Sequence, residues 1–226
     1  LEAAGDFERG LRIDPKPVWD WRTLALFHLA AGEHGKYEGV CAQMMGRYDR
    51  STDPLVNRSV AFTCSARACG VSDPLQLLRF TERMPGNARD ADYLWILSRV
   101  LLRAGQHEAA IEDLSHAARL SPLDPESYWS ETMMAASHIF LGRNAEGLAW
   151  ATRALAHGPT YWATLWFSAV ANALSGDIEE ARRFTPRIRQ LHPDMRLSNL
   201  KDHMPTRRPE DLERVREGLR LAGLPE

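Results

Sequence analysis

The chain has 226 residues, and its 28 lysines and arginines nearly balance its 30 aspartates and glutamates. With 44% hydrophobic and 26% charged residues, the composition is that of an ordinary globular protein and excludes a disordered or collagen-like chain. The formal net charge of −2 provides no global attraction to nucleic acid or to an anionic membrane surface.

Cysteine usage and apolar runs indicate the compartment. Cys41, Cys64 and Cys69 form no CxxC pair, and their odd number argues against a closed disulfide framework. We therefore expect a reducing, cytoplasmic environment. The longest apolar stretches, residues 24–31 and 161–174, are shorter than the roughly 20 residues that span a bilayer, so no membrane partner is expected. Leu1 stands inside a helical pattern without an initiator methionine, and we expect a fragment of a longer polypeptide.

Three glycines and three prolines recur at a nearly constant interval. Gly105, Gly142 and Gly176 are separated by 37 and 34 residues, and a proline follows each of them by 17 residues. Small or aliphatic residues recur five and twelve positions after each glycine, at Ala110, Gly147, Ala181, Ala117, Ala154 and Ile188. This spacing predicts pairs of antiparallel helices, because glycine ends the first helix and proline stops the second. One pair cannot cover its own apolar face, so the pairs are predicted to stack.

The segment 91–124 carries this pattern most completely, at Leu94, Leu97, Leu101, Gly105, Ala110, Leu114, Ala117 and Pro122. In these residues the chain resembles the tetratricopeptide repeat (TPR) family, although Leu94, Glu131 and Leu165 stand where the family has an aromatic residue. The resemblance implies an all-α, right-handed α-solenoid of stacked helix-turn-helix repeats. The expected units are 1–17 (partial), 18–53, 54–90, 91–127, 128–161 and 162–195, and residues 196–226 are expected to form C-terminal capping helices.

The first half of the chain follows the pattern less closely. Residues 1–15 are expected to be the second helix of a repeat whose first helix is missing. The segment EHGKYEG at 33–39 is interpreted as an insertion that shifts the following helix to about Tyr37–Tyr48. Residues 53–84 are expected to form a degenerate helix pair, with Ser72 or Asp73 capping the second helix and Pro74 in its first turn.

Two stretches of the sequence resemble the repeat regions of particular groups of bacterial proteins. Residues 21–84, which contain GKYEGVCAQMMGRY, are similar to repeat regions that follow bacterial serine/threonine kinase and β-propeller modules. The end of the chain, from RLSPLDPESYW to PEDLERVREGLRLAGLPE, is similar to the closing segment of repeat domains attached to bacterial adenylate cyclases and winged-helix regulators. Both similarities imply the accessory C-terminal half of a bacterial signalling protein.

The repeat pattern ends near residue 193. The segment MRLSNLKDHM predicts a short helix and TRRPEDLERVREGLRLAGLPE a longer one, with Thr206 as its N-cap, Pro209 in its first turn and Gly223 at its end. An apolar stripe is expected along the longer helix, at Leu212, Val215, Leu219 and Leu221. Two interpretations stay open: the helix covers the last apolar face of the array, or it enters the groove and inhibits it.

The sequence carries no motif of a catalytic or cofactor site. It has no HExxH, GxSxG, P-loop or GxGxxG stretch, and none of its eight histidines stands at metal-ligand spacing. His28 and His138 are interpreted as packed core residues, and Cys64 and Cys69 as small buried ones. The arginines of residues 182–189 are interpreted as a solvated helix face, so nucleic acid is not an expected partner. We expect a non-catalytic protein without a metal or cofactor.

Large aromatic residues and arginines are the candidates for a binding site. The TPR resemblance implies that the first helix of each pair lines a concave groove, and in this register the groove residues are Trp19, Arg22, Trp95, Arg99, Trp129, Met133, Phe140, Trp166 and Phe167. Aromatic residues with arginine anchor peptides at interfaces. Aromatic residues also pack between repeats, and both interpretations stay open.

The expected function is that of a protein-interaction scaffold that binds a peptide or helix of a protein partner. The Lys/Asn pattern with which some TPR proteins hold a terminal carboxylate is absent, so an apolar or amphipathic helix is the expected ligand. The alternative is a regulatory or self-association domain of a larger bacterial signalling enzyme, a kinase or cyclase, which holds its own missing N-terminal module. A second copy of the chain, in a homo-oligomer, is a further possible partner.

Overall fold

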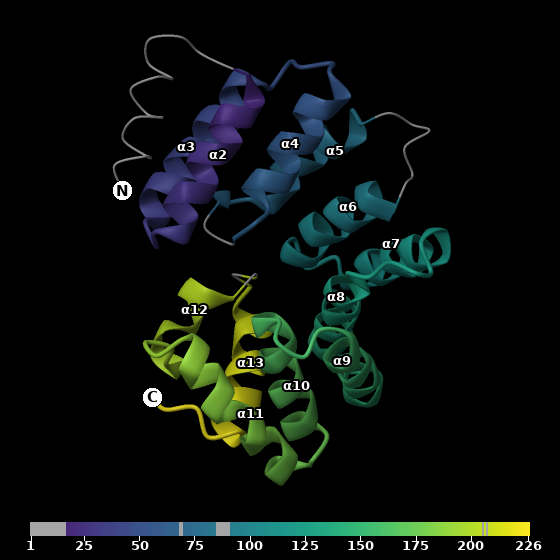
Figure 1. The fold of residues 1–226 in the computed structure, drawn as a ribbon, viewed down its shortest axis with the longest axis vertical. Coiled ribbons are helices and arrows are strands. Elements are labelled where there is room, and N and C mark those ends of the chain that lie inside the picture. Colours follow the sequence, from purple (N-terminus) through teal and green to yellow (C-terminus); the bar gives the residue numbers. More distant parts are fainter. Residues whose placement is uncertain (1–16, 68–69, 85–90, 205, 207) are drawn as a thin grey trace. The chain divides into compact units, whose positions relative to one another are not determined.

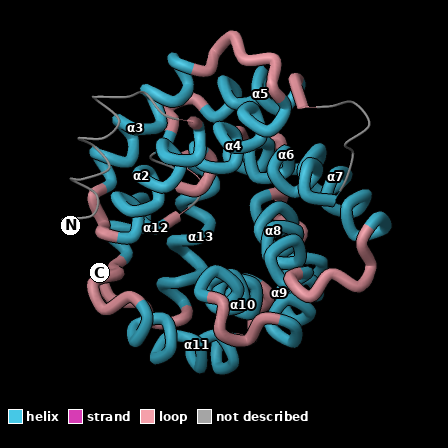
Figure 2. Tube along the Cα trace, turned by 45° about the horizontal axis from the view of Figure 1, so that its top comes forward, coloured by secondary structure: helices cyan, strands magenta, loops and turns pink. Residues whose placement is uncertain are grey.

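A computed structural model describes residues 17–67, 70–84, 91–204, 206 and 208–226. Across these residues every regular element is a helix, and none of these helices is long and apolar enough to cross a membrane (Figures 1 and 2). The chain divides into two compact units, residues 1–100 (unit 1) and residues 101–226 (unit 2). The expected partial repeat at 1–17 lies, except for Pro17, outside the described residues, as does Cys69.

Unit 1 is built from two helix pairs and most of a further helix. Its elements are α2 (Val18–Ala30), α3 (His34–Arg47), α4 (Pro54–Cys64), η2 (Pro74–Leu77), α5 (Leu78–Glu82) and the greater part of α6 (Ala91–Arg103). Helix α2 packs on α3 and α4, and α4 packs on α5. The buried core includes Trp21, Tyr37, Met44, Val60, Leu77, Phe80 and Ile96.

Unit 2 contains the regular repeats and the C-terminal helices. Its elements are α7 (His107–Leu120), α8 (Ser127–Phe140), α9 (Asn144–His157), α10 (Trp162–Leu174), α11 (Ile178–Leu191), η3 (Leu197–Asn199), α12 (Leu200–His203) and α13 (Pro209–Leu221). From α7 to α11 each helix packs on the next one, and α10 also packs on α8. The predicted short and long tail helices correspond to η3–α12 and to α13.

The glycine turns predicted at Gly105, Gly142 and Gly176 are confirmed, and Gly32 forms a further turn of the same kind. Gly32, Gly105, Gly142 and Gly176 have φ between 72° and 94°, a left-handed conformation that glycine adopts without steric cost. After each glycine, the next residue's N–H donates to the carbonyl five residues back, at 2.9–3.0 Å, which satisfies a free carbonyl of the ending helix. The following helix starts two residues after each glycine.

Gly32 and Gly39 offer a matched pair for testing this turn. An added Cβ would meet nothing within 4 Å at either position, but only Gly32 has a positive φ, of 72°. We expect Gly32→Ala to lower the free energy of unfolding by about 1 kcal/mol. Gly39→Ala, inside α3, is expected to raise it by roughly 0.5–1 kcal/mol. Urea denaturation of both variants checks the prediction, and changes of the same sign would contradict it.

The prediction that residues 33–39 form an insertion, which shifts the start of the next helix to about Tyr37, is wrong. Helix α3 begins at His34, two residues after Gly32, as in the other pairs. Gly35 and Gly39 lie on the exposed side of this helix and do not break it, while Tyr37 is completely buried in the core of unit 1. Burial of Tyr37, Val40, Cys41 and Met44 on one face therefore outweighs the low helix propensity of the two glycines.

Of two N-cap residues predicted from the sequence, the structure confirms one and differs at the other. The Asp73 side chain accepts a hydrogen bond from the Leu75 N–H, and Pro74 opens the next element, which begins as a 3-10 turn before α5. For α13 the N-cap residue is Arg208 and not Thr206, so that prediction is wrong. The Thr206 hydroxyl is instead engaged with a carboxylate inside the helix, that of Asp211, at 3.2 Å.

Candidate functional site

Two buried histidines are packed among the helices of the fold. His28 is 1% exposed, and its ring nitrogen lies 2.7 Å from the Glu33 carboxylate, which lowers the pKa of Glu33. His138 is also buried, and burial lowers its pKa. Both histidines are core residues, as predicted. Among the described residues no group of three His, Cys, Asp or Glu side chains is placed to hold a metal ion.

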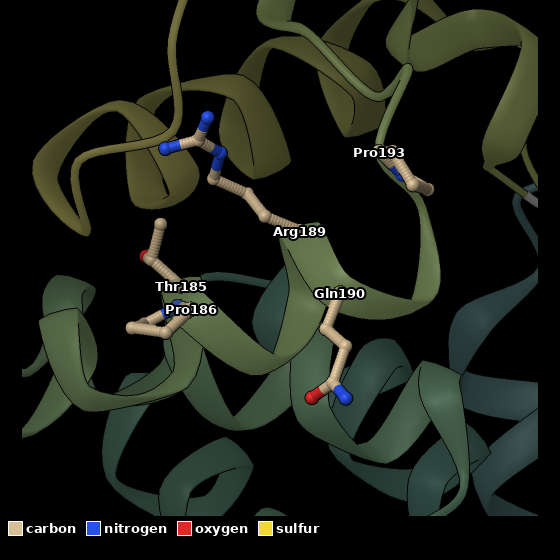
Figure 3. A pocket seen from close by; sticks show the side chains of 5 residues that line it. All are labelled: Thr185, Pro186, Arg189, Gln190 and Pro193. Atoms are coloured by element: carbon tan, nitrogen blue, oxygen red, sulfur yellow. The ribbon is translucent and has the colours of Figure 1, made fainter.

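A surface depression of about 390 Å³ lies along α11, lined by Thr185, Pro186, Arg189, Gln190 and Pro193. Figure 3 shows that the side chains of Arg189 and Gln190 extend away from one another. A small-molecule site needs a few polar groups that converge on the ligand. The depression lacks this convergence, and the four arginines of α11 are exposed to solvent.

Unit 1 brings together four of the predicted groove residues and one residue that was not predicted, Phe62. The Arg22 guanidinium carbon lies 4.4 Å from the centre of the Phe62 ring and 5.9 Å from that of Trp19. The Arg99 guanidinium carbon lies 5.3 Å from the Phe62 ring and 4.6 Å from the Trp95 ring. The rings of Phe62 and Trp95 are 5.9 Å apart. These five residues form an alternating set across α2, α4 and α6, which we call the aromatic–arginine ladder.

The ladder is partly open to solvent and positively charged. Trp19 is 48% exposed, and the other four side chains are partly exposed. Burial lowers the pKa of Arg22, and the neighbouring Arg58 charge lowers it further. Arg58 itself is paired with Asp92 on α6, whereas Arg22 has no carboxylate partner in the described part of the chain. Among the described residues, no carboxylate therefore neutralises the cationic charge of Arg22.

Sequence reasoning missed Phe62, although the repeat interval contains a signal for it. Arg58 and Phe62 precede Trp95 and Arg99 by 37 residues each, which is the interval between Gly105 and Gly142. Both pairs are spaced by four residues, so each pair lies on one face of its helix. Position 62 on α4 therefore corresponds to position 99 on α6, which is a predicted groove position. This correspondence identifies Phe62 as a groove residue, and its ring lies between Arg22 and Arg99.

The five groove candidates of unit 2 are in a different environment. Trp129, Met133 and Phe140 on α8 are half-buried, and the Trp129 ring lies 6.1 Å from that of Tyr161. The ring of Phe140 lies 5.0 Å from His107 and 6.0 Å from Phe167. Aromatic contacts between successive helix pairs account for the positions of Trp129 and Phe140.

Trp166 and Phe167 are buried, with exposed fractions of 1% and 3%. The Trp166 ring contacts His192, which follows α11, and His203 on α12, at 5.0 and 6.2 Å between ring centres. His192 and His203 both lie after α11, so they belong to the C-terminal segment of the chain. A partner would reach the side of Trp166 that they cover only if this segment moved.

Helix α13 covers further surface of unit 2. It packs along α10 and contacts α8, α11 and α12 (Figure 1). Nearly the whole of α10, from Ala163 to Ala171, is buried as a result of packing on several sides. In unit 1 the ladder, by contrast, keeps partly exposed side chains.

Known proteins share this fold without a close match in sequence. Neither a family model nor a curated protein sequence matches the chain. A thermophilic TPR protein of Thermus thermophilus is similar in structure, with 16% identity and a TM-score of 0.60 over 90% of this chain and 99% of that one. A chain in the structure of the APC/C hetero-tetramer Cut9–Hcn1 is similar at 12% identity and a TM-score of 0.61, over 96% of this chain and 39% of that one.

PilF of Pseudomonas aeruginosa is a further similar structure, with 14% identity and a TM-score of 0.56 over 91% of this chain and 86% of that one. At these identities the likeness is one of fold. The chain therefore has the TPR fold, an all-α array of stacked helix pairs, as its glycine and proline spacing predicts.

Proposed function

We propose that this chain is a non-catalytic protein-interaction scaffold whose binding surface is the aromatic–arginine ladder of unit 1. The observation that carries the proposal is the stacking of Arg22 and Arg99 against Phe62, with Trp19 and Trp95 at the two ends. Stacked guanidinium groups are held in place before a partner arrives, so less side-chain entropy is lost on binding.

The ladder suits a partner segment that carries both carboxylates and apolar side chains. A guanidinium group whose face rests on an aromatic ring still presents its N–H donors at its edge, where a carboxylate accepts two of them. Arg22 and Arg58 repel one another, and an incoming negative charge relieves this repulsion. The exposed part of Trp19 offers apolar area beside the charges. An acidic amphipathic helix or peptide combines these features.

The remaining predicted groove residues extend the proposal to unit 2 only in part. Trp129, Met133 and Phe140 keep some exposure, and Trp166 and Phe167 have almost none. In the proposal, the primary anchors are therefore Trp19, Arg22, Phe62, Trp95 and Arg99. The assignment of the chain to a cytoplasmic bacterial signalling protein, and a regulatory or self-association role beside a kinase or cyclase module, stay predictions from the sequence.

Selection of peptides against the intact chain tests the proposal even while the natural partner is unidentified. From a displayed library of random 12-residue peptides, we expect enrichment of sequences with Asp or Glu next to aromatic or aliphatic residues. The double charge reversal Arg22→Glu, Arg99→Glu is expected to weaken the selected peptides at least 30-fold, or about 2 kcal/mol. Fluorescence anisotropy measures the affinities.

The matched control is a double reversal of equal charge on α11, Arg182→Glu and Arg183→Glu, both at exposed positions. Its affinity should stay within about threefold of the unmodified chain, since only long-range charge is altered. Peptides that lack acidic residues, or equal losses for the two double variants, would refute the ladder as the binding surface. Sedimentation of the chain alone distinguishes the self-association alternative, which requires a dimer that the ladder variant loses.

A further inference from the structure

The C-terminal helix α13 contacts unit 2 through one face. Asp211, Arg214, Val215, Gly218 and Leu219 stand at positions i, i+3, i+4, i+7 and i+8, which share one side of a helix. Val215 and Leu219 are fully buried, whereas Glu213 and Arg220 on the other side are exposed. The pattern is that of an amphipathic helix lying on a surface.

The tightest approach is made at Gly218. A Cβ added there would lie 2.7 Å from Val170 Cγ1 and 3.0 Å from the Val170 Cα on α10. The second contact involves backbone, which cannot rotate away. Only glycine therefore allows α13 to approach α10 this closely.

The start of α13 is held by a buried polar cluster at the turn before α7. The Asp211 carboxylate is 2% exposed and lies 3.2 Å from His107 Nε2, and its other oxygen accepts from the Thr206 hydroxyl at 3.2 Å. Arg208 donates to the Gly105 carbonyl oxygen at 3.0 Å. The first turn of α13 is thus fixed by charged and polar groups rather than by apolar burial.

A second polar contact lies one repeat further on, at the turn before α9. Arg214 donates to Asn144 Oδ1 at 2.8 Å, and its guanidinium group lies beside Gly142. Arg208 and Arg214 are six residues apart and engage turns that are 37 residues apart in sequence. At its end the helix reaches α11, where the Thr185 hydroxyl donates to the Ala222 carbonyl oxygen.

This placement differs from that of the helix that begins the next pair in the array. Helix α10 packs on both α8 and α9 of the preceding pair, whereas α13 packs mainly on α10 and reaches back to α8 and to the turn before α7. A helix in that position occupies the surface formed by successive first helices. Part of its attachment is polar: the Asp211 carboxylate is 2% exposed, and its desolvation offsets a large part of its attraction to the groups around it.

We propose that α13 is a releasable internal ligand of unit 2, and that a partner helix with the same pattern displaces it. The pattern is a carboxylate, an arginine three residues later and a glycine seven residues later, with an aliphatic residue directly after each of the last two. This assignment concerns unit 2 and does not depend on the ladder of unit 1.

A labelled peptide of residues 206–226 serves as the probe, titrated into the intact chain and into its Gly218→Val variant. The substitution makes the internal α13 a poor ligand and leaves the receiving surface on α8, α10 and the two turns unchanged. We expect the peptide to bind the variant at least tenfold more tightly than the unmodified chain. A peptide that itself carries Gly218→Val should not bind.

Two control variants accompany the titration. Glu213→Gln, on the exposed side of α13, should leave the peptide affinity at the level of the unmodified chain, and so should Glu38→Gln, at an exposed position of unit 1. Equal affinities of the Gly218→Val variant and the unmodified chain would overturn the proposal. Binding that is insensitive to the glycine of the peptide would overturn it as well.

Native-state hydrogen exchange of the unmodified chain decides the matter if the variant does not fold. The amides of α13 are expected to exchange at least tenfold faster than those of α10, through an opening that leaves α10 protected. Equal protection of the two helices would mean that α13 opens only when unit 2 unfolds, and it would overturn the proposal.

Discussion

Replacement of Trp166 by alanine is expected to lower the free energy of unfolding of unit 2 by about 3–5 kcal/mol. The side chain is 1% exposed, and its ring lies 4.6 Å from that of Trp162 and 5.0 Å from that of His192. Removal of the indole leaves a cavity between α10 and the C-terminal segment, and the surrounding helices cannot close it fully. A loss of this size is a large fraction of the stability of a small domain.

Chemical denaturation followed by circular dichroism measures this loss. Leu123→Ala is the matched control, because Leu123 belongs to the same unit and is 93% exposed; its effect should stay within about 0.5 kcal/mol. If Trp166→Ala were as mild as the control, the indole would not be a packing residue, and the burial described for α10 would be incorrect.

Replacement of Tyr37 by alanine is expected to have a similar effect on unit 1, about 3–5 kcal/mol. Tyr37 is completely buried, and its hydroxyl donates to the Thr63 carbonyl oxygen at 2.6 Å and accepts from the Arg67 N–H at 3.3 Å. It thereby joins α3 to the end of α4. Tyr37→Phe keeps the ring but leaves the two backbone groups without this partner, which costs about 1–3 kcal/mol.

The comparison of the two Tyr37 variants separates ring packing from hydrogen bonding. Thermal and urea denaturation of both variants provide the free energies, and Glu38→Ala, at the exposed neighbouring position of α3, is the control with an expected change within about 0.5 kcal/mol. A Tyr37→Phe variant as stable as the unmodified chain would contradict the structural role of the hydroxyl.

The repeat architecture could be predicted because its signals are local. A glycine with positive φ ends one helix and a proline follows the next, so Gly105, Gly142 and Gly176 mark the units without reference to distant residues. The same rule failed near Gly35 and Gly39. Within a helix these residues need no special backbone conformation, and only the burial of Tyr37 shows that the helix continues through them.

The candidate site was predictable to the extent that it follows the repeat interval. Trp19, Arg22, Trp95 and Arg99 were placed on one kind of helix by register, and the structure brings them together, from α2 and α6, around Phe62 of α4. Phe62 follows from the same interval, although its helix is too degenerate to suggest it alone. The exposure of each side chain did not follow, because it depends on which other helices pack on the same face.

The C-terminal tail illustrates the limit of local reasoning. The polar contacts of α13 join Asp211 to His107 and Arg208 to Gly105, residues that are more than 100 positions apart. No periodicity relates them, so neither the N-cap at Arg208 nor the burial of Asp211 could be read from the tail. A stripe of apolar residues shows that a helix needs a surface, and it leaves the choice of surface open.

The sequence by itself determined the helix pairs, their turns and their stacking, because helix ends and helix faces depend on residues within one or two turns. The tertiary structure alone decided that Trp19, Phe62 and Trp95 of the ladder keep exposed surface while Trp166 and Phe167 are covered. Accessibility is a property of the packed chain: it depends on where a distant segment comes to lie, and that position is set by the sum of many contacts of which each is small.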